Sequence, residues 1–198
     1  VVHAMTTIAT GGFSSKSGSI GSYNNVNLEA LTILFMILAS LPFVLYLKAI
    51  RGKPKDLIGD QQVQGFFKIL VVSILIVVFY LFLTSNFTFT EILRYSLFNV
   101  TSILTGTGFT STNYNDWGTP IILLFLFITF IGGCAGSTTC GVKIFRLQIV
   151  FNNSKEMISK LISPNRVVNK RYNGEHLSPE ITQSVITFLF IFILTFIV

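Results

Sequence analysis

Charged residues are scarce in this sequence. Only 11% of its 198 residues are charged, whereas 51% are hydrophobic and 20 are phenylalanine. A soluble chain of this length needs a charged and polar surface, which this composition does not provide. Its apolar runs are instead long enough to cross a bilayer. The composition therefore predicts an integral membrane protein.

Cysteine and histidine are also rare, with two residues of each. Cys134 and Cys140 lie in a glycine-rich segment with no histidine nearby, and one cysteine pair is too few ligands for a metal site. We interpret both as small packing residues of a membrane helix. An intramembrane hydrolase would pair a Ser or Asp with a histidine inside the membrane. The topology described below places His3 and His176 at opposite faces, which argues against that class.

The basic residues are unevenly distributed. Eleven of the 14 Lys and Arg fall in residues 48–55 and 143–171, each flanking an apolar span, and Lys68 lies near the same side. Only Lys16 and Arg94 fall in the opposite loops. This is the asymmetry of the positive-inside rule, which places the two basic segments in the cytoplasm. It also explains the net charge of +6 without a nucleic-acid partner.

Four apolar runs predict the membrane crossings. Pro42 is expected to kink the first of them, because proline removes one helical hydrogen bond. Asn27 is expected to cap its N-terminus, with Glu29 in the first turn. Thr119 and Pro120 suit the N-cap and first position of a later helix. The predicted spans are residues 28–50, 65–85, 120–150 and, incompletely, 181–198.

A shorter segment, residues 86–104, is too short and too polar to cross the membrane, yet apolar enough to be buried. Thr88 and Glu91 have the spacing of a capping box, so a short re-entrant helix is expected to begin there. It leads into a turn that we call the second turn: Thr105-Gly106-Thr107-Gly108-Phe109-Thr110.

A similar turn occurs 96 residues earlier, when Gly12 is aligned with Gly108. This first turn follows a short helix within residues 1–9, and the same offset matches Pro42 with Thr138. The offset predicts repeats, and because the chain begins in one motif and ends in an apolar run, we expect a longer polypeptide. The first turn is Ala9-Thr10-Gly11-Gly12-Phe13-Ser14. The predicted parts are the end of one repeat (1–56), a complete repeat (57–151), a cytoplasmic linker (152–177) and the start of another repeat (178–198).

Both turns are suited to ion conduction. A cation that crosses a membrane must replace its water shell with other oxygens, and backbone carbonyls serve when glycine allows the necessary conformations. The helix before each turn directs its negative end toward the ion. A single turn of this kind is more typical of an ordinary loop, but two copies in register favour a selectivity filter. The predicted ion-binding residues are Thr10, Gly11, Gly12, Gly106, Thr107 and Gly108.

The span 120–150 breaks after Ile131 into a glycine-rich loop, and the helix is expected to resume over residues 142–151. Small residues change conformation at low cost, so this loop is a candidate gate. A phosphate-binding loop is disfavoured, because the lysine comes one residue late and no Ser or Thr follows it. Lys143 could anchor the loop, form an electrostatic barrier or simply extend to the membrane surface. The loop consists of Gly132, Gly133, Cys134, Ala135, Gly136, Ser137, Thr138, Thr139, Cys140 and Gly141.

These three motifs together resemble the TrkH potassium transporter family, which groups with TrkG, KtrB and the plant HKT proteins. The resemblance covers nearly the whole chain. It implies an all-α integral membrane fold in which repeated membrane–pore helix–membrane units surround a pseudo-fourfold pore. It also implies K+ as the transported ion bound at the filter residues, no organic cofactor, and the glycine-rich loop as an intramembrane gate.

The resemblance further implies a multi-pass protein of the bacterial cytoplasmic (inner) membrane, a homodimer and a cytosolic nucleotide-binding subunit of the TrkA type. The basic segment 143–171 could dock that subunit or serve only to orient the chain. Two positions depart from the family pattern: Gly106, where Ser or Thr is expected, and residues 139–141, which commonly read Gly-Gly-Gly. A Na+-selective or Na+-coupled transporter of the same fold remains an alternative, because two of the four filter segments lie outside this chain.

Overall fold

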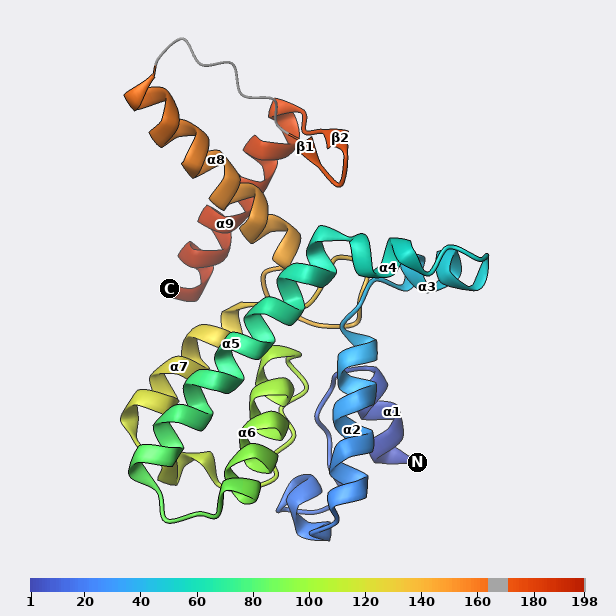
Figure 1. The fold of residues 1–198 in the computed structure, drawn as a ribbon, viewed down its shortest axis with the longest axis vertical. Helices are drawn as coiled ribbons and strands as arrows, with labels where there is room; N and C mark the ends of the chain where they lie inside the picture. Colours follow the sequence, from blue (N-terminus) through green and yellow to red (C-terminus); the bar gives the residue numbers. More distant parts are fainter. Residues whose placement is uncertain (164–170, 198) are drawn as a thin grey trace.

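The computed structural model describes residues 1–163 and 171–197, and most of them are helical (Figure 1). The predicted helical fold is confirmed. The described residues also contain one β-hairpin, whose two strands have two residues each. The elements in chain order are α1 (Val2–Ile8), η1 (Ser19–Tyr23), α2 (Val26–Ala39), α3 (Phe43–Ile50), α4 (Lys55–Gly59), α5 (Gln61–Thr84), α6 (Phe89–Leu104), η2 (Tyr114–Trp117), α7 (Thr119–Phe130), α8 (Ile144–Ile162), β1 (Arg171–Tyr172), β2 (Glu175–His176) and α9 (Pro179–Ile197).

Helix α5 is the longest membrane-spanning helix of the described chain. Its 24 residues rise about 36 Å, enough to cross the hydrocarbon core. It begins at Asp60, whose carboxylate accepts hydrogen bonds from the Gln62 and Val63 amides, so it starts before the predicted residue 65. One side of α5 packs on α6 and, near its start, on α8, while its other side exposes apolar residues that suit lipid.

The first span differs most from the prediction. In place of one kinked helix over 28–50, α2 and α3 are separate helices that meet at 93°. Pro42 starts α3 as its N-cap, and a residue before proline avoids the helical conformation, so Leu41 ends the continuity. The N-cap of α2 is Asn25 rather than Asn27, because the Asn25 side chain accepts from two amides of the first turn.

Helix α6 lies between α5 and α2 (Figure 1). The predicted capping box is present: the Thr88 amide donates to the Glu91 carboxylate at 3.0 Å. With 16 residues the helix is too short to span the membrane, and most of its last two turns are buried. It therefore enters from one side and ends inside the protein, at the second turn.

The C-terminal third also corrects the prediction. Helix α7 is capped at Gly118 rather than Thr119, and α8 begins at Ile144 and continues to Ile162 instead of ending near residue 151. The first part of the predicted linker 152–177 is thus helical. Its polar residues are compatible with a solvent-exposed helix as well as with a loop. Glu156 and Lys160, one turn apart, form an ion pair at 2.6 Å on this extension. Residues 164–170 of that linker lie outside the described part of the chain.

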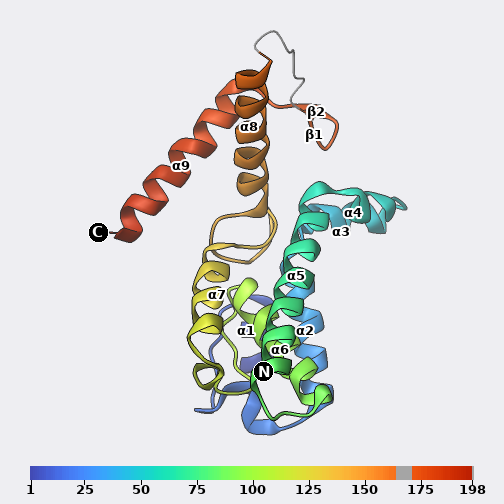
Figure 2. The ribbon, with the colours of Figure 1, turned by 60° about the vertical axis from the view of Figure 1, so that its left-hand side comes forward.

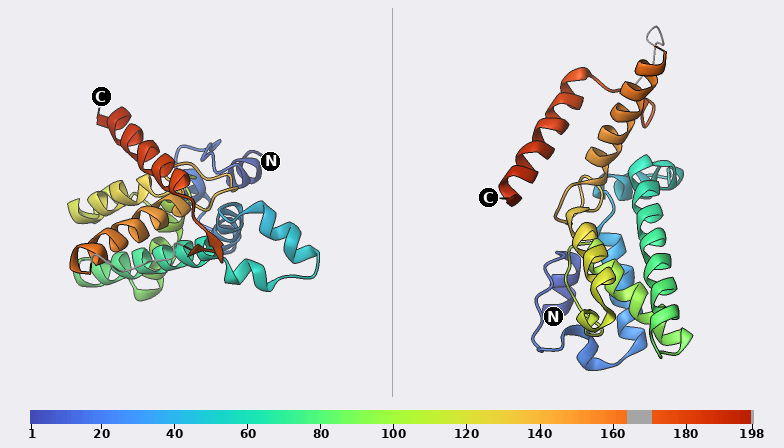
Figure 3. Two further views of the ribbon diagram at one scale, coloured as in Figure 1. Left: turned by 90° about the horizontal axis from the view of Figure 1, so that it is seen from above. Right: turned by 90° about the vertical axis from the view of Figure 1, so that its left-hand side faces the viewer.

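Helices α8 and α9 form a pair that extends from one end of the bundle (Figures 2 and 3). The Arg146 guanidinium lies 3.8 Å from the centre of the Phe188 ring, which joins the two helices. The helices α3 and α4, which flank the basic residues Arg51 and Lys53, lie toward this same end, whereas η1 and the start of α6 lie at the opposite end (Figure 1). The two ends therefore match the predicted cytoplasmic and outer faces.

This arrangement predicts an accessibility difference between two serines, both exposed in the structure. In the full-length protein, a Ser17→Cys variant should react with a membrane-impermeant thiol reagent added to intact cells. A Ser154→Cys variant, in α8, should react only after the cells are opened. A Cys134→Ala, Cys140→Ala background removes the native thiols of this chain. The reverse labelling pattern would contradict the topology.

Candidate ion pathway

The two turns share one backbone geometry. Thr10 and Gly106 have φ values of +49° and +71°, and Gly12 and Gly108 have +67° and +80°. The Gly11 amide donates to the Thr6 carbonyl at 2.8 Å, and the Thr107 amide donates to the Ser102 carbonyl at 2.9 Å. Each of these pairs is separated by 96 residues, the offset found in the sequence. Glycine adopts this left-handed backbone conformation without strain, and three of these four positions are glycine. Thr10 is the exception.

The turns also lie against each other. A Cβ atom added to Gly12 would lie 1.9 Å from the Thr107 carbonyl oxygen, so the two backbones are in direct contact. Beyond the turns, the Gly21 amide donates to the Thr110 carbonyl at 3.0 Å, and the Thr110 amide donates to the Ser19 hydroxyl at 3.3 Å. The structure thus brings all six predicted ion-binding residues into two adjacent turns.

Their side chains are largely occupied by the protein itself. The Thr105 and Thr107 hydroxyls are 2.8 Å apart and both residues are buried. The Thr10 hydroxyl lies 2.8 Å from the Ala9 carbonyl of its own turn and 3.0 Å from the Thr138 carbonyl of the glycine-rich loop. Gly106 and Gly108 are exposed. Carbonyl groups, rather than hydroxyls, are therefore the oxygens that these turns can offer to an ion.

The glycine-rich loop leaves α7 and returns to α8 through a closed neck. The Gly132 amide donates to the Val142 carbonyl at 2.8 Å, and the Val142 amide donates to the Phe130 carbonyl at 2.9 Å. A Cβ on Gly132 would lie 2.0 Å from the Cys140 carbonyl oxygen. Glycine at this position is thus required by the close approach of the two sides of the neck.

Thr139 is the centre of the hydrogen bonds inside the loop. Its hydroxyl accepts from the Gly133 amide at 2.9 Å and lies 2.8 Å from the Ser137 hydroxyl. The Lys143 ammonium donates to the same hydroxyl at 3.2 Å and also to the Thr139 carbonyl. Lys143 is thus bound to the loop in this structure through Thr139, a position where the resemblance led us to expect glycine.

The loop fits into the break between α2 and α3. The Cys134 amide donates to the Ser40 carbonyl at 3.0 Å, and the Phe43 amide donates to the Gly136 carbonyl at 3.0 Å. The Thr138 amide donates to the Ala39 carbonyl at 3.3 Å. The loop therefore satisfies carbonyls that the break releases from helical bonding.

The same loop contacts the turns. The Thr138 hydroxyl donates to the Ile8 carbonyl at 2.9 Å, at the end of α1, while the Thr138 carbonyl accepts from Thr10. On the other side, Cys140 has the atoms nearest to a Cβ built on Gly106, at 3.8 Å. The loop thus lies next to both turns, at the side of the α6 C-terminus (Figure 1).

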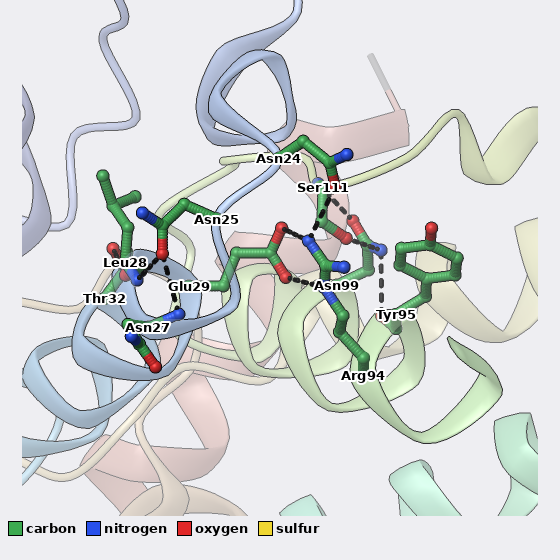
Figure 4. A network of polar contacts seen from close by, with 10 residues as sticks. All are labelled: Asn24, Asn25, Asn27, Leu28, Glu29, Thr32, Arg94, Tyr95, Asn99 and Ser111. Carbon is green, nitrogen blue, oxygen red and sulfur yellow. Dashed lines mark hydrogen bonds and ion pairs between the residues drawn. The ribbon is translucent and has the colours of Figure 1, made fainter. Parts of the chain in front are cut away.

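Two contacts near the turns could not be recognised from local sequence patterns. Glu29 of α2 is buried and ion-paired with Arg94 of α6, and Asn99 of α6 bonds to Ser111 just after the second turn (Figure 4). The available signal was a lone carboxylate in an apolar membrane helix, which usually has a partner and a role. Within residues 1–163 and 171–197, no group of His, Cys, Asp and Glu is suited to hold a metal ion.

Known proteins resemble the chain over its whole length. The family model described as TrkH, cation transport protein, matches residues 1–198. The Trk system potassium uptake protein TrkI of Halomonas elongata is 40% identical over 98% of this chain and 40% of its own length. TrkG of Escherichia coli is 31% identical over 98% of this chain and 40% of that protein.

A solved structure agrees with this assignment. The crystal structure of the potassium transporter TrkH from Vibrio parahaemolyticus has a TM-score of 0.93 and 29% identity over 98% of this chain and 42% of that one. The chain thus spans about two fifths of the length of the relatives that it matches. The predicted helical membrane fold and the multi-pass location in the cytoplasmic membrane are confirmed. The chain belongs to the TrkH family of cation transport proteins.

Proposed function

We propose that this chain supplies two of the four segments of a K+ selectivity filter, together with the loop that gates it. The observation that carries the proposal is the contact between two turns with the same left-handed positions, 96 residues apart. The names of the relatives, Trk potassium uptake proteins, favour K+ as the ion.

The chemistry of the turns supports this role. Each turn follows the C-terminus of a short helix, α1 or α6, where the helix dipole is negative. Neither turn contains a carboxylate, so a cation would be held by dipoles and could leave again, as conduction requires. The predicted site comprises the backbone carbonyls of Thr10, Gly11, Gly12, Gly106, Thr107 and Gly108, while the side chains of Thr10 and Thr107 position the backbone.

The glycine-rich loop is the proposed gate. It lies next to both turns and is held to the neighbouring segments by hydrogen bonds of Cys134, Ala135, Gly136 and Thr138. Non-helical backbone at this depth is tolerated where it lines a cavity or is buried in protein. A loop of small residues can exchange between two arrangements. In the closed one it keeps its hydrogen bonds to the α2–α3 break and to the first turn, and in the open one it releases them. Lys143 would anchor the closed arrangement through Thr139.

The partners follow from the family. We propose that the full-length protein forms a homodimer and binds a cytosolic nucleotide-binding subunit of the TrkA type. Helix α8 extends beyond the bundle at the cytoplasmic end, and exposed residues such as Lys155 make its far half a suitable docking surface (Figure 2). No organic cofactor is needed in this chain for conduction.

The decisive experiment compares K+ and Na+ flux through the full-length protein in liposomes. We expect K+ flux to exceed Na+ flux by about tenfold or more, which corresponds to about 1.4 kcal/mol of discrimination. Empty liposomes, and liposomes with the protein and an impermeant cation, serve as controls. Equal fluxes, or flux that prefers Na+ or requires it, would replace this proposal with the sodium alternative.

A further inference from the structure

Glu29 is an acidic residue in an apolar membrane helix, and it is buried with 2% exposure. A buried carboxylate is costly unless it is paired and hydrogen-bonded. Both of its oxygens meet Arg94: Nε donates at 2.7 Å and Nη2 at 2.8 Å (Figure 4). A two-point contact of this kind fixes orientation as well as distance.

This pair joins two different repeats. Glu29 lies in the first turn of α2, the helix that follows the first turn, whereas Arg94 lies near the start of α6, which leads into the second turn. Arg94 Nη2 also donates to the Asn24 side chain at 3.2 Å, at the end of η1. Helix α6 is thereby tied to both α2 and the segment before it.

A second set of bonds continues from α6 to the second turn. The Asn99 side chain donates to the Ser111 hydroxyl at 2.9 Å and accepts from the Ser111 amide at 3.3 Å (Figure 4). A Cβ on Gly21 would lie 2.3 Å from the Ser111 carbonyl oxygen, so the segments after the two turns are tightly packed. A shift of α6 against α2 would therefore move Ser111, and Gly108 lies only three residues before Ser111 in the chain.

The charges of the pair cancel. A lone Glu29 near the outer mouth would attract cations, but the guanidinium neutralises it at contact distance. The geometry of the Glu29–Arg94 pair thus suits a structural role, in which the pair holds the turns in place, rather than the attraction of ions.

We infer that Glu29 and Arg94 form a positioning pair that keeps the two turns in register and thereby sets the ion selectivity of the pathway. This inference rests on the proposed function, since it assigns the pair a role in the same filter. It goes beyond that function by placing a selectivity determinant outside the turns.

The test measures K+ and Na+ flux of the full-length protein in liposomes. Glu29→Gln and Arg94→Gln should each lower the K+ over Na+ ratio by roughly tenfold. The exchanged double variant, Glu29→Arg with Arg94→Glu, should restore the ratio to within about twofold of the wild type. Lys16→Gln is the matched control: it removes a positive charge from an exposed residue at the same face and should leave the ratio unchanged.

The outcomes separate the two claims. A wild-type protein that does not prefer K+ overturns the proposed function and this inference with it. A selective wild type whose single variants keep its ratio, or whose exchanged variant remains unselective, overturns the positioning pair alone. If the Gln variants do not insert, Arg94→Lys decides, because it keeps the charge but cannot contact both oxygens and Asn24 in the same way. An unchanged ratio in that variant also overturns the pair.

Discussion

Replacing Gly12 with Ala is expected to abolish selective K+ flux through the full-length protein. The added Cβ would lie 1.9 Å from the Thr107 carbonyl oxygen, a distance that no packing tolerates. The position also has φ of +67°, which costs a residue with a Cβ about 1–2 kcal/mol. Because the clash moves a carbonyl of the other turn, one substitution displaces two of the four proposed filter segments.

Flux measurements in liposomes check this expectation against two other glycines. Gly108→Ala has the same backbone strain, with φ of +80°, but no atom of this chain within 4 Å of the new Cβ, so it should lower the K+ over Na+ ratio less. Gly59→Ala is the control, because it meets no atom within 4 Å and lies in α4, away from the turns. Selective flux in Gly12→Ala, at the level of Gly59→Ala, would falsify the filter assignment.

The sequence predicted those features that depend on local chemistry. The capping box at Thr88 and the positions of α5, α6 and α9 follow from patterns within a few residues. The repeat offset also proved informative, since it aligns Thr10 with Gly106 and Gly12 with Gly108, and all four residues have positive φ in the structure. The cap and the helix positions are local because each depends on one helix, whereas the offset compares two turns whose local sequences are alike.

The features that the sequence did not predict depend on distant partners. The bend of 93° exceeds an ordinary proline kink because the loop residues Cys134 and Thr138 bind the carbonyls that the break frees. The Glu29–Arg94 pair joins residues 65 positions apart, and only packing brings them together. The N-cap of α2 is Asn25, two residues before the predicted Asn27. Both asparagines carry a suitable capping side chain, so the local sequence does not distinguish them.

The predicted site illustrates the same limit. The glycines of both turns were identified from their spacing, but the role of the threonines was not. The Thr10 hydroxyl contacts the glycine-rich loop as well as its own turn, and Thr139 organises that loop at a position where the resemblance led us to expect glycine. A hydroxyl has many possible partners, so its role is decided by the folded structure.

Deleting residues 134–140 in the full-length protein is expected to raise K+ flux by about tenfold or more, the second large effect. Gly132, Gly133 and Gly141 remain to join Ile131 to Val142, and the parallel bridge between these two residues, which needs a longer connection, is lost with the loop. The deletion exposes carbonyls of Ile8, Ala39 and Ser40. That exposure is tolerable only where water can replace the lost donors, as it can along an ion pathway.

A milder variant separates a gate from a structural loop. Thr138→Val keeps the shape of the side chain but removes the hydroxyl that donates to the Ile8 and Ala39 carbonyls, so flux should rise severalfold with the K+ over Na+ ratio kept. Thr129→Val is the matched control, since its hydroxyl donates to Phe125 within α7 and does not touch the loop. If the deletion and Thr138→Val both conduct at the wild-type rate, the loop does not limit flux. If Thr129→Val raises flux equally, the effect comes from a loosened α7, because Thr138 is the loop residue that, among residues 1–163 and 171–197, hydrogen-bonds to the end of α1 and to Thr10 of the first turn.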